Sequence, residues 1–322
     1  MIISKTPFRV SLFGGGSDYE NFYSKHGSML IGFTFDKYNY ISYRKTPSIV
    51  PYKTRLCYSK TEVVNRNTQI RHDGIRGVLE YLNVKYGVDI NNMSELPAQT
   101  GTGSSSSFIV GLLNCIYKFK NKKVSRKQLA EEAIFIERKL LNEPGGIQDQ
   151  IWAAYGGINS IVIHKDGCFD VKPLPISESF KEEFMDRSVL LYTGKTRKSF
   201  RIANEVKKND NEDAKKKILD ISYKAHDKFY EQDIDGVGEL LNQTWIQKKK
   251  LSKLVNSPHV QEMHKTLLDC GMIGGKLLGA GGSGFIFGIM KSPKTKEQLK
   301  KKYKTKYIPI NIEYNGSQII NF

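Results

Sequence analysis

Three glycine-rich segments constrain the fold of this chain more than any other feature of its sequence. They are Gly14–Gly16, the stretch 99–107 and Gly279–Gly284. Glycine has no Cβ, so at each segment the backbone can come close to a ligand or to another part of the chain. Segments with strand or helix patterns flank all three. We therefore expect three loops between regular elements, each with bare backbone.

The length and composition are those of a globular enzyme. The 322 residues suffice for two domains or one large one, and 39% hydrophobic with 26% charged residues is ordinary for such a protein. No apolar run approaches the roughly 18 residues of a membrane span, and Met1–Lys5 does not begin a secretion signal. The four cysteines are scattered, which favours free thiols. These features predict a cytoplasmic protein with no membrane partner.

A net charge of +17 is the unusual bulk property. Such a charge suits nucleic acid, an anionic membrane surface or a phosphorylated small molecule. The lysines fall mostly on predicted helices, where lysine ordinarily marks the solvated face. No nucleic-acid-binding motif accompanies them, so we expect no nucleic-acid partner, whereas a substrate that already carries phosphate fits the charge. The groups lie at Lys120–Lys127, Lys207–Lys217, Lys248–Lys253 and Lys294–Lys306.

The first half of the chain mixes strands and helices. Residues 2–13 and 38–43 are predicted as strands because tyrosine, isoleucine and phenylalanine are enriched there. Ser125 and Gln128 resemble a capping box, which begins a helix at 126–142. Pro144-Gly145-Gly146 ends that helix. Further predicted elements are helices at 73–86, 104–119 and 147–155 and a β-hairpin within 157–173.

The second half is mainly helical, and we place a domain boundary near 175–187. Ser257 and Pro258 start one of its helices as N-cap and first helical residue, and Gly271 ends it. The predicted elements are helices at 197–231, 235–255 and near 294–304, and strands before the third glycine loop, at 285–290 and at 307–314. The predicted domains are 1–180 and 181–322.

The stretch 99–107 is a candidate phosphate-binding loop. Gly101 and Gly103 leave the backbone bare, and a helix begins at Ser104 after them. The first N–H groups of a helix lack internal partners and the helix dipole makes that end positive, so phosphate binds there readily. The serine hydroxyls add donors and a magnesium ligand. An ordinary serine-rich capping loop is the alternative.

A Walker-type phosphate loop is excluded. Gly194-Lys195-Thr196 imitates the last three residues of that motif. However, Val189 stands where its first glycine is required. Any nucleotide must therefore be held by another kind of loop.

Three acidic residues are candidates for chemistry beside these loops. Glu137 lies at the edge of an apolar helix stripe, where a carboxylate is costly unless a cation or a donor satisfies it. Magnesium is the more specific interpretation, and a glutamate that reaches past the edge to water or a lysine is the alternative. Asp149 begins a short helix and can equally be a surface acid. Asp18 follows three glycines and can equally be a turn residue.

The three loops, in this order and with these acids between them, resemble the GHMP kinase superfamily, which includes galactokinase, homoserine kinase and mevalonate kinase. The resemblance covers almost the whole chain through Pro7–Tyr19, Pro97–Ser107 and Lys276–Gly284. The triple glycine of the first motif and the segment Thr193–Arg197 look most like the branch that phosphorylates the anomeric hydroxyl of D-glycero-D-manno-heptose 7-phosphate.

This resemblance implies an α+β fold. The N-terminal α/β domain would contain a left-handed β-α-β unit, an exception to the usual right-handed rule. The C-terminal domain would be ferredoxin-like, and ATP would lie between the two domains.

The resemblance also implies roles for individual residues. Asp149 matches the catalytic base of several members, and Arg9 matches a basic residue beside the transferring phosphoryl group. Ser105 and Glu137 match the magnesium ligands. Arg197 would reach the phosphate that the substrate already carries. The implied ATP-binding residues are Gln99, Thr100, Gly101, Thr102, Gly103, Ser104, Ser105 and Ser106, and the other implied substrate-binding residues are Gly15, Gly16, Ser17, Asp18, Gly281 and Gly282.

Some positions depart from the family pattern. Gln99 replaces a glycine, Thr102 a leucine and Ser283 a glycine, which bears on loop shape and nucleotide preference but removes no charged group. The expected activity is an ATP- and magnesium-dependent sugar 1-kinase, with a homodimer as a candidate assembly. The alternatives are a kinase of an unphosphorylated sugar such as fucose or galactose, a non-catalytic sugar and ATP sensor, and a basic nucleic-acid binder.

Overall fold

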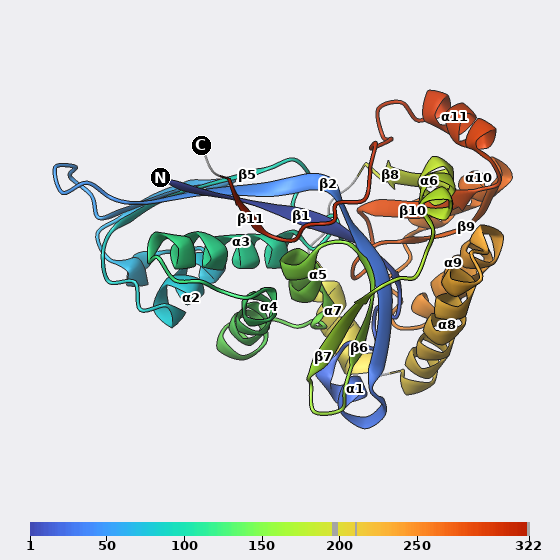
Figure 1. Ribbon diagram of the computed structural model, residues 1–322, viewed down its shortest axis with the longest axis horizontal. Helices are drawn as coiled ribbons and strands as arrows, with labels where there is room; N and C mark the ends of the chain where they lie inside the picture. The colour runs from blue at the N-terminus through green and yellow to red at the C-terminus, as the bar shows by residue number, and fades with distance from the viewer. Residues whose placement is uncertain (195–198, 210, 321–322) are drawn as a thin grey trace.

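The computed structural model describes residues 1–194, 199–209 and 211–320. Two sheets form its framework, and helices pack against both. Figure 1 shows the long strands β1 (Ile2–Phe13) and β2 (Ser28–Lys45) running along the molecule, with α2 to α5 on one side of them. The smaller sheet lies at the far end, beside α8 and α9.

The larger sheet has the strand order β11-β1-β2-β5-β3-β4, and β6 pairs with β2 and β7. β1 and β2 are antiparallel, with a register shift directly after Pro7. Proline cannot donate to a sheet ladder, so such shifts are found beside it. The bounds of the other strands are β3 Thr54–Cys57, β4 Thr61–Val64, β5 Val88–Ser94, β6 Ile158–Ile163, β7 Phe169–Pro173 and β11 Gln318–Ile320.

The central helix is α3 (Ser104–Phe119), whose residues 106–117 are all buried. Gly111 lets the helix approach β1 closely, since a Cβ there would lie 2.7 Å from Thr6 Oγ1. This contact fixes where the amino end of α3 opens. The helices around it are α1 Glu20–His26, α2 Asp73–Tyr81, α4 Arg126–Phe135 and α5 Gln148–Tyr155.

The smaller sheet has the order β8-β10-β9, all antiparallel. Phe33 of the larger sheet packs edge-on against Phe184 and Phe287, with ring centroids 6.1 and 5.7 Å apart. One apolar core therefore joins the two sheets. The bounds here are β8 Ser188–Tyr192, β9 Met272–Leu277, β10 Phe285–Met290, α6 Glu178–Arg187, α7 Ser199–Asn209, α8 Glu212–Tyr230, α9 Ile234–Lys248, α10 Pro258–Asp269 and α11 Pro293–Lys302.

The predicted α+β class is confirmed, and most predicted elements are present. The hairpin within 157–173 is β6 and β7. Ser125 and Ser257 cap α4 and α10 through their hydroxyls, at 3.0 and 3.4 Å from the amides that donate to them. β3 and β5 form a parallel pair whose connection includes α2, which supplies a β-α-β unit.

Two predicted elements are wrong. The helix at 126–142 ends as α4 at Phe135 and continues as a π-helix over Ile136–Leu140. The expected last strand at 307–314 is replaced by isolated bridges at Tyr307 and Ile312. The chain instead returns to the larger sheet, where β11 pairs with β1 near the N-terminus (Figure 1). The predicted division into 1–180 and 181–322 stays a prediction. The segment 181–322 contributes one strand, β11, to the larger sheet.

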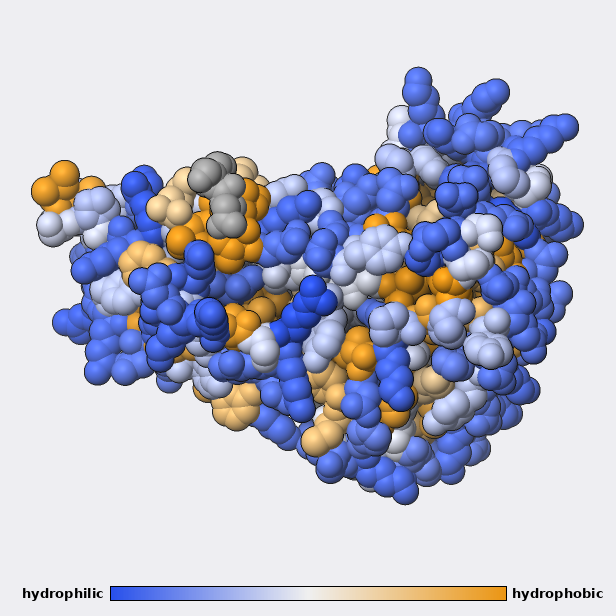
Figure 2. Space-filling model, in the orientation of Figure 1, coloured by the Kyte–Doolittle hydropathy of each residue, from blue (hydrophilic) through white to orange (hydrophobic). Residues whose placement is uncertain are grey.

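Much of the positive charge lies on solvated surface, as expected. The lysines of α11 and the turn after it are mostly exposed, and hydrophilic side chains project into solvent over this helix in Figure 2. The four cysteines are free. Over the described ranges, the helices are too short or too polar to cross a bilayer.

Candidate active site

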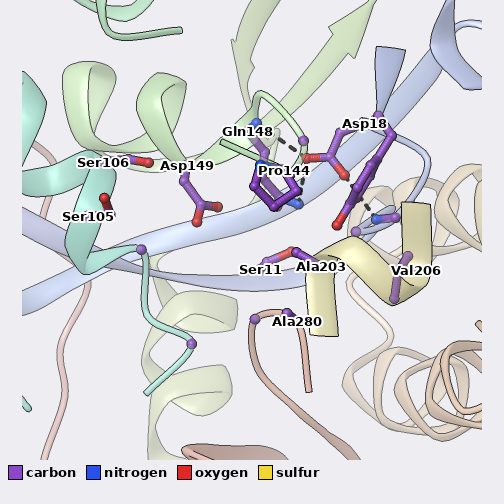
Figure 3. A pocket seen from close by; sticks show the side chains of 18 of the residues that line it. Ser11, Asp18, Ser105, Ser106, Pro144, Gln148, Asp149, Ala203, Val206 and Ala280 are labelled. Carbon is purple, nitrogen blue, oxygen red and sulfur yellow. Dashed lines mark hydrogen bonds between the residues drawn. The ribbon is translucent and has the colours of Figure 1, made fainter. Parts of the chain in front are cut away.

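A cavity of about 560 Å³ lies where the three glycine-rich loops meet. Its wall includes Arg9 from β1, the amino end of α3, the π-helix, the start of α5 and residues 279–280. Figure 3 shows Ser105, Ser106 and Asp149 on one side of this space and Asp18 with Gln148 on the other. Groups from both sheets therefore face one volume.

The stretch 99–107 forms the phosphate-loop candidate that its sequence predicts. Gly101 and Gly103 have φ values of +82° and +79°, which favour glycine because other residues are strained there. Gly103 is the N-cap of α3 and has no side chain to cap the first amides. The residues that carry those N–H groups, Ser104 to Ser106, line the cavity. Free amides and the positive end of the helix dipole make this an anion site.

The third glycine loop packs directly on the first turn of the phosphate loop. A Cβ on Gly279 would lie 2.3 Å from Gly101 Cα, and a Cβ on Gly101 would lie 2.6 Å from Leu278 O. On the other side, a Cβ on Gly284 would lie 2.1 Å from Thr100 O. Both contacts are backbone against backbone, so glycine is required at these positions.

Arg9, which is buried, and Asp149, which is partly exposed, form a bidentate pair at the cavity wall. Arg9 Nε and Nη2 donate to Asp149 Oδ1 and Oδ2 at 2.9 and 2.8 Å, and Nη1 donates to Gly101 O at 2.5 Å. Asp149 stands in the first turn of α5, close to Gly103 of the phosphate loop. A fork of donors that matches a carboxylate fixes both side chains. The carboxylate is therefore held in the cavity wall next to the amino end of α3.

Glu137 lies on the π-helix and is 1% exposed. Its Oε2 accepts hydrogen bonds from Ser106 Oγ at 2.7 Å and from Gln150 Nε2. Its Oε1 is buried and has no hydrogen-bond partner among the described residues. A buried carboxylate oxygen without a partner is costly, so this atom is suited to a ligand that enters the cavity.

Asp18 is buried in the opposite wall. It accepts hydrogen bonds from Gly16 N at 2.9 Å and from Gln148 Nε2 at 3.0 Å. Burial raises its pKa, the hydrogen bond from Gly16 opposes that shift, and the charge of Asp149 adds to it. Gly146 packs on the carboxylate, where a Cβ would lie 1.8 Å from Oδ2.

The structure brings most of the predicted site residues together around this cavity. Ser105 lines the cavity, but Ser106 is the serine that contacts Glu137. Arg197 lies outside the described residues. The predicted residues that line the cavity are Arg9, Gly15, Gly16, Asp18, Gln99, Gly101, Gly103, Ser104, Ser105, Ser106, Glu137 and Asp149.

Five predicted residues lie behind the cavity wall. Ser17 bonds to Gly14 O and Ser28 Oγ, and Thr100 bonds to Pro97 O. Thr102 supports the wall through its carbonyl, which accepts from Arg9 N at 3.1 Å. Gly281 and Gly282 pack on Val255. The residues of the third glycine loop that line the cavity are Gly279 and Ala280.

Two lysines of the cavity wall were missed as site residues. Lys248 Nζ donates to Leu277 O at 2.7 Å and Gly279 O at 2.5 Å, and Lys276 Nζ donates to Leu12 O at 2.7 Å. The sequence predicts a solvated face for the group Lys248–Lys253, and for Lys248 this prediction is wrong, because its exposed fraction is 7%. The sequence contains a signal for this burial. Lys248 follows Val237, Leu241 and Thr244 at helical spacing, on the buried face of α9.

Burial lowers the pKa of both lysines. For Lys248 burial is the largest cause and the charge of Arg9 the next, and together they bring the pKa to about 7. For Lys276 burial and then the charge of Lys248 lower the pKa well below its ordinary value. Both groups serve as donors that hold the third glycine loop and β1 in place.

The sequence matches two models of one family. The model of the GHMP kinases N terminal domain matches residues 73–157, and that of the GHMP kinases C terminal matches residues 225–309. Together they span slightly more than half of the chain and include the phosphate loop, Glu137, Asp149 and both buried lysines. This chain belongs to the GHMP kinase family.

Among similar GHMP kinases, one from Campylobacter jejuni is described as D-glycero-alpha-D-manno-heptose 7-phosphate kinase. It is 27% identical over 300 residues, which are 89% of this chain and 88% of that protein. A solved structure described as a D-glycero-D-manno-heptose 1-phosphate kinase from Bacteroides thetaiotaomicron aligns with a TM-score of 0.82 at 22% identity, over 100% of this chain and 99% of that one. A putative sugar kinase from Campylobacter jejuni aligns with a TM-score of 0.78 at 22% identity, over 100% and 98%. These structures share the fold.

Replacing Lys248 by methionine should change how stability depends on pH. The folded chain releases the Lys248 proton near pH 7, whereas the unfolded chain keeps it up to about 10.5. Between these values the unfolded state binds more protons, so this group makes the free energy of unfolding rise with pH, by at most about 1.4 kcal/mol per unit. Lys248→Met lacks that contribution.

Urea unfolding of the native protein and of Lys248→Met, between about pH 7 and 9, measures this difference. The native free energy of unfolding should gain on that of the variant as pH rises. Lys250→Met, just beyond the end of α9, should follow the native protein. A constant gap between the native protein and Lys248→Met across this range would contradict a lowered pKa.

Proposed function

We propose that this chain is a sugar 1-kinase that transfers the terminal phosphoryl group of ATP to the anomeric hydroxyl of a heptose 7-phosphate. The product would be a heptose 1,7-bisphosphate for nucleotide-activated heptose synthesis. GHMP kinases are phosphotransferases that use ATP, and the heptose 7-phosphate kinase of Campylobacter jejuni is similar over 89% of this chain. The observation that carries the proposal is the Arg9–Asp149 pair, which lies beside the amino end of α3 at the wall of one cavity.

The phosphate side of the reaction is assigned to the loop 99–107. Its bare amides and the end of α3 suit the phosphates of ATP, which need positioning and charge neutralisation more than covalent chemistry. Arg9 adds a positive charge beside Gly101. Because Arg9 is already fixed by Asp149, it is preorganised to stabilise charge that develops during transfer.

The acceptor side is assigned to Asp149. In the proposed step the anomeric oxygen bonds to the terminal phosphorus, the bond from that phosphorus to the bridging oxygen of ADP breaks, and the hydroxyl proton passes to the Asp149 carboxylate. Asp18, Gly15 and Gly16 line the neighbouring wall, where they suit contact with sugar hydroxyls. The net charge of +17 suits an acceptor that already carries a phosphate.

Magnesium is proposed to bind at Glu137. Over the described residues no group of three or more histidine, cysteine, aspartate or glutamate side chains could hold a metal by itself. Magnesium does not need one, since it commonly takes one or two carboxylates with phosphate oxygens. The buried Oε1 of Glu137 has no hydrogen-bond partner in the described part of the chain and fits this chemistry, and Ser105 or Ser106 would add a hydroxyl. When bound, the ion would neutralise phosphate charge. A homodimeric assembly and a cytoplasmic location stay predictions.

An acceptor screen tests the proposed function. ATP consumption is measured with free and phosphorylated hexoses and heptoses, with and without magnesium. We expect turnover with a heptose 7-phosphate and at least about a tenfold lower kcat/KM with the free heptose, because a lost charged contact costs that much. Preference for free fucose or galactose would replace the proposal by the alternative kinase. If no acceptor leads to ATP consumption, the proposal would be replaced by the alternative of a non-catalytic sugar and ATP sensor.

Asp149→Asn should lower kcat by about 10²- to 10⁴-fold, the usual contribution of a positioned general base. KM for both substrates should change little, because the amide keeps the size of the carboxylate. Steady-state kinetics give both constants, and thermal unfolding confirms that the variant is folded. Asp213→Asn, an exposed acid in α8, serves as the control. Native turnover in Asp149→Asn would remove this residue from the mechanism.

Glu137→Gln should raise the magnesium concentration needed for half-maximal activity by at least about tenfold, since even an outer partner of a metal site costs this much. Direct calorimetric titration of magnesium in the presence of ADP should show the same loss. Glu143→Gln is the matched control, because Glu143 also lines the cavity but does not contact Ser106. An equal magnesium requirement in the native protein and Glu137→Gln would exclude Glu137 as a ligand.

A further inference from the structure

Arg138 lines the cavity beside Glu137, yet neither the sequence motifs nor the proposed mechanism uses it. Its side chain is 15% exposed. Nη1 donates to Glu143 O at 2.8 Å. Nη2 lies 3.8 Å from Glu137 Oε2, which is too far for a hydrogen bond. Nε is buried and has no hydrogen-bond partner in the described part of the chain. Within the described ranges, the Nε–H and Nη2–H donors of this cavity-lining residue therefore have no hydrogen-bond acceptor.

The other described cations of the cavity wall are occupied. Each of the three guanidinium nitrogens of Arg9 has an acceptor, in Asp149 or Gly101. Lys248 and Lys276 are buried and donate to backbone carbonyls. Of the two guanidinium groups described in the cavity wall, Arg138 is thus the one with nitrogens that have no hydrogen-bond acceptor.

The π-helix explains how Arg138 reaches the cavity. The α-helical ladder of α4 ends at Phe135, and Leu141 N bonds back to Ile136 O. The wider turn brings the adjacent residues Glu137 and Arg138 to the same cavity wall, although neighbours on an α-helix point in different directions. Single π-turns inside helices are frequent at functional sites.

The loop after the π-helix holds the guanidinium in place. Gly145 has φ +150°, and a Cβ there would lie 3.1 Å from Arg138 Nη1. The same loop presses Gly146 onto Asp18. The positive charge of Arg138 also opposes the burial that raises the pKa of Tyr19. Arg138 therefore stands between the Glu137 side of the cavity and the wall of Asp18 and Tyr19.

We propose that Arg138 binds a phosphate group of the reacting ligands through its free Nε–H and Nη2–H donors. A planar fork of N–H groups matches two oxygens of a phosphate, and such charge-assisted pairs are stronger than neutral ones. The phosphate has two sources in the proposed function, on which this inference rests. One is the group that ATP transfers, and the other is the group that the acceptor already carries.

The kinetic test compares Arg138→Met with Arg126→Met, which removes the same charge at the exposed start of α4. A rise of at least about tenfold in KM for heptose 7-phosphate, with no rise for free heptose, assigns Arg138 to the acceptor phosphate. A comparable rise in KM for ATP, or a fall in kcat with both acceptors, assigns it to the transferred group. Kinetic constants within about twofold of the Arg126→Met control would overturn the proposal.

A binding test needs no turnover, so it separates this inference from the proposed function. Calorimetry measures the Kd of inorganic pyrophosphate for the native protein, Arg138→Met, Arg138→Lys and Arg126→Met. We expect binding at least about tenfold weaker in Arg138→Met, native binding in Arg126→Met and partial recovery in Arg138→Lys, which keeps the charge but loses the fork. An unchanged Kd in folded Arg138→Met would overturn the proposal. If that variant does not fold, native affinity in Arg138→Lys together with native kinetics would overturn it.

Discussion

Direct backbone contact between Gly101 and Gly279 sets the geometry of the whole cavity. The phosphate loop belongs to the larger sheet's side of the molecule and the third glycine loop to the smaller sheet, so this contact fixes one relative to the other. Lys248 stabilises the third glycine loop at this contact by donating hydrogen bonds to Leu277 O and Gly279 O. Interiors are close-packed and deform little, so the third glycine loop is held at a fixed distance from the loop that leads into α3.

The buried charged groups Arg9 and Glu137 have specific partners at this junction, which is how a protein tolerates charge away from water. Arg9 is paired with Asp149, and Glu137 is bonded to Ser106 and Gln150. These pairs need no rearrangement when a charged ligand arrives, and preorganised groups stabilise developing charge at least cost. The exceptions are the second oxygen of Glu137 and the Nε of Arg138. Both atoms lack a hydrogen-bond partner among the residues that the structure describes, and their residues line the same cavity.

Local signals identified much of the fold and the site. Caps at Ser125 and Ser257, the hairpin of β6 and β7, and the helix opening at Ser104 were predictable because neighbouring residues decide them. The π-helix was not, since its sequence continues the helical pattern of α4. The bridges within 307–314 and the pairing of β11 with β1 depend on partners far away in the sequence, such as Leu191 for Tyr307 and Ile3 for Ile320, which no local pattern can report.

The sequence by itself determined the chemistry: the glycines that allow bare backbone, the serines that open α3, and the acids and Arg9 that can handle phosphate. Only the tertiary structure decided which of them share the cavity. In the structure Ser106 donates a hydrogen bond to Glu137, and Gly281 and Gly282 do not line the cavity. Lys248 and Lys276 are buried in the cavity wall. The physical reason is that motif spacing limits which residue types lie near a loop, whereas burial and hydrogen bonding depend on the elements that pack from elsewhere in the chain.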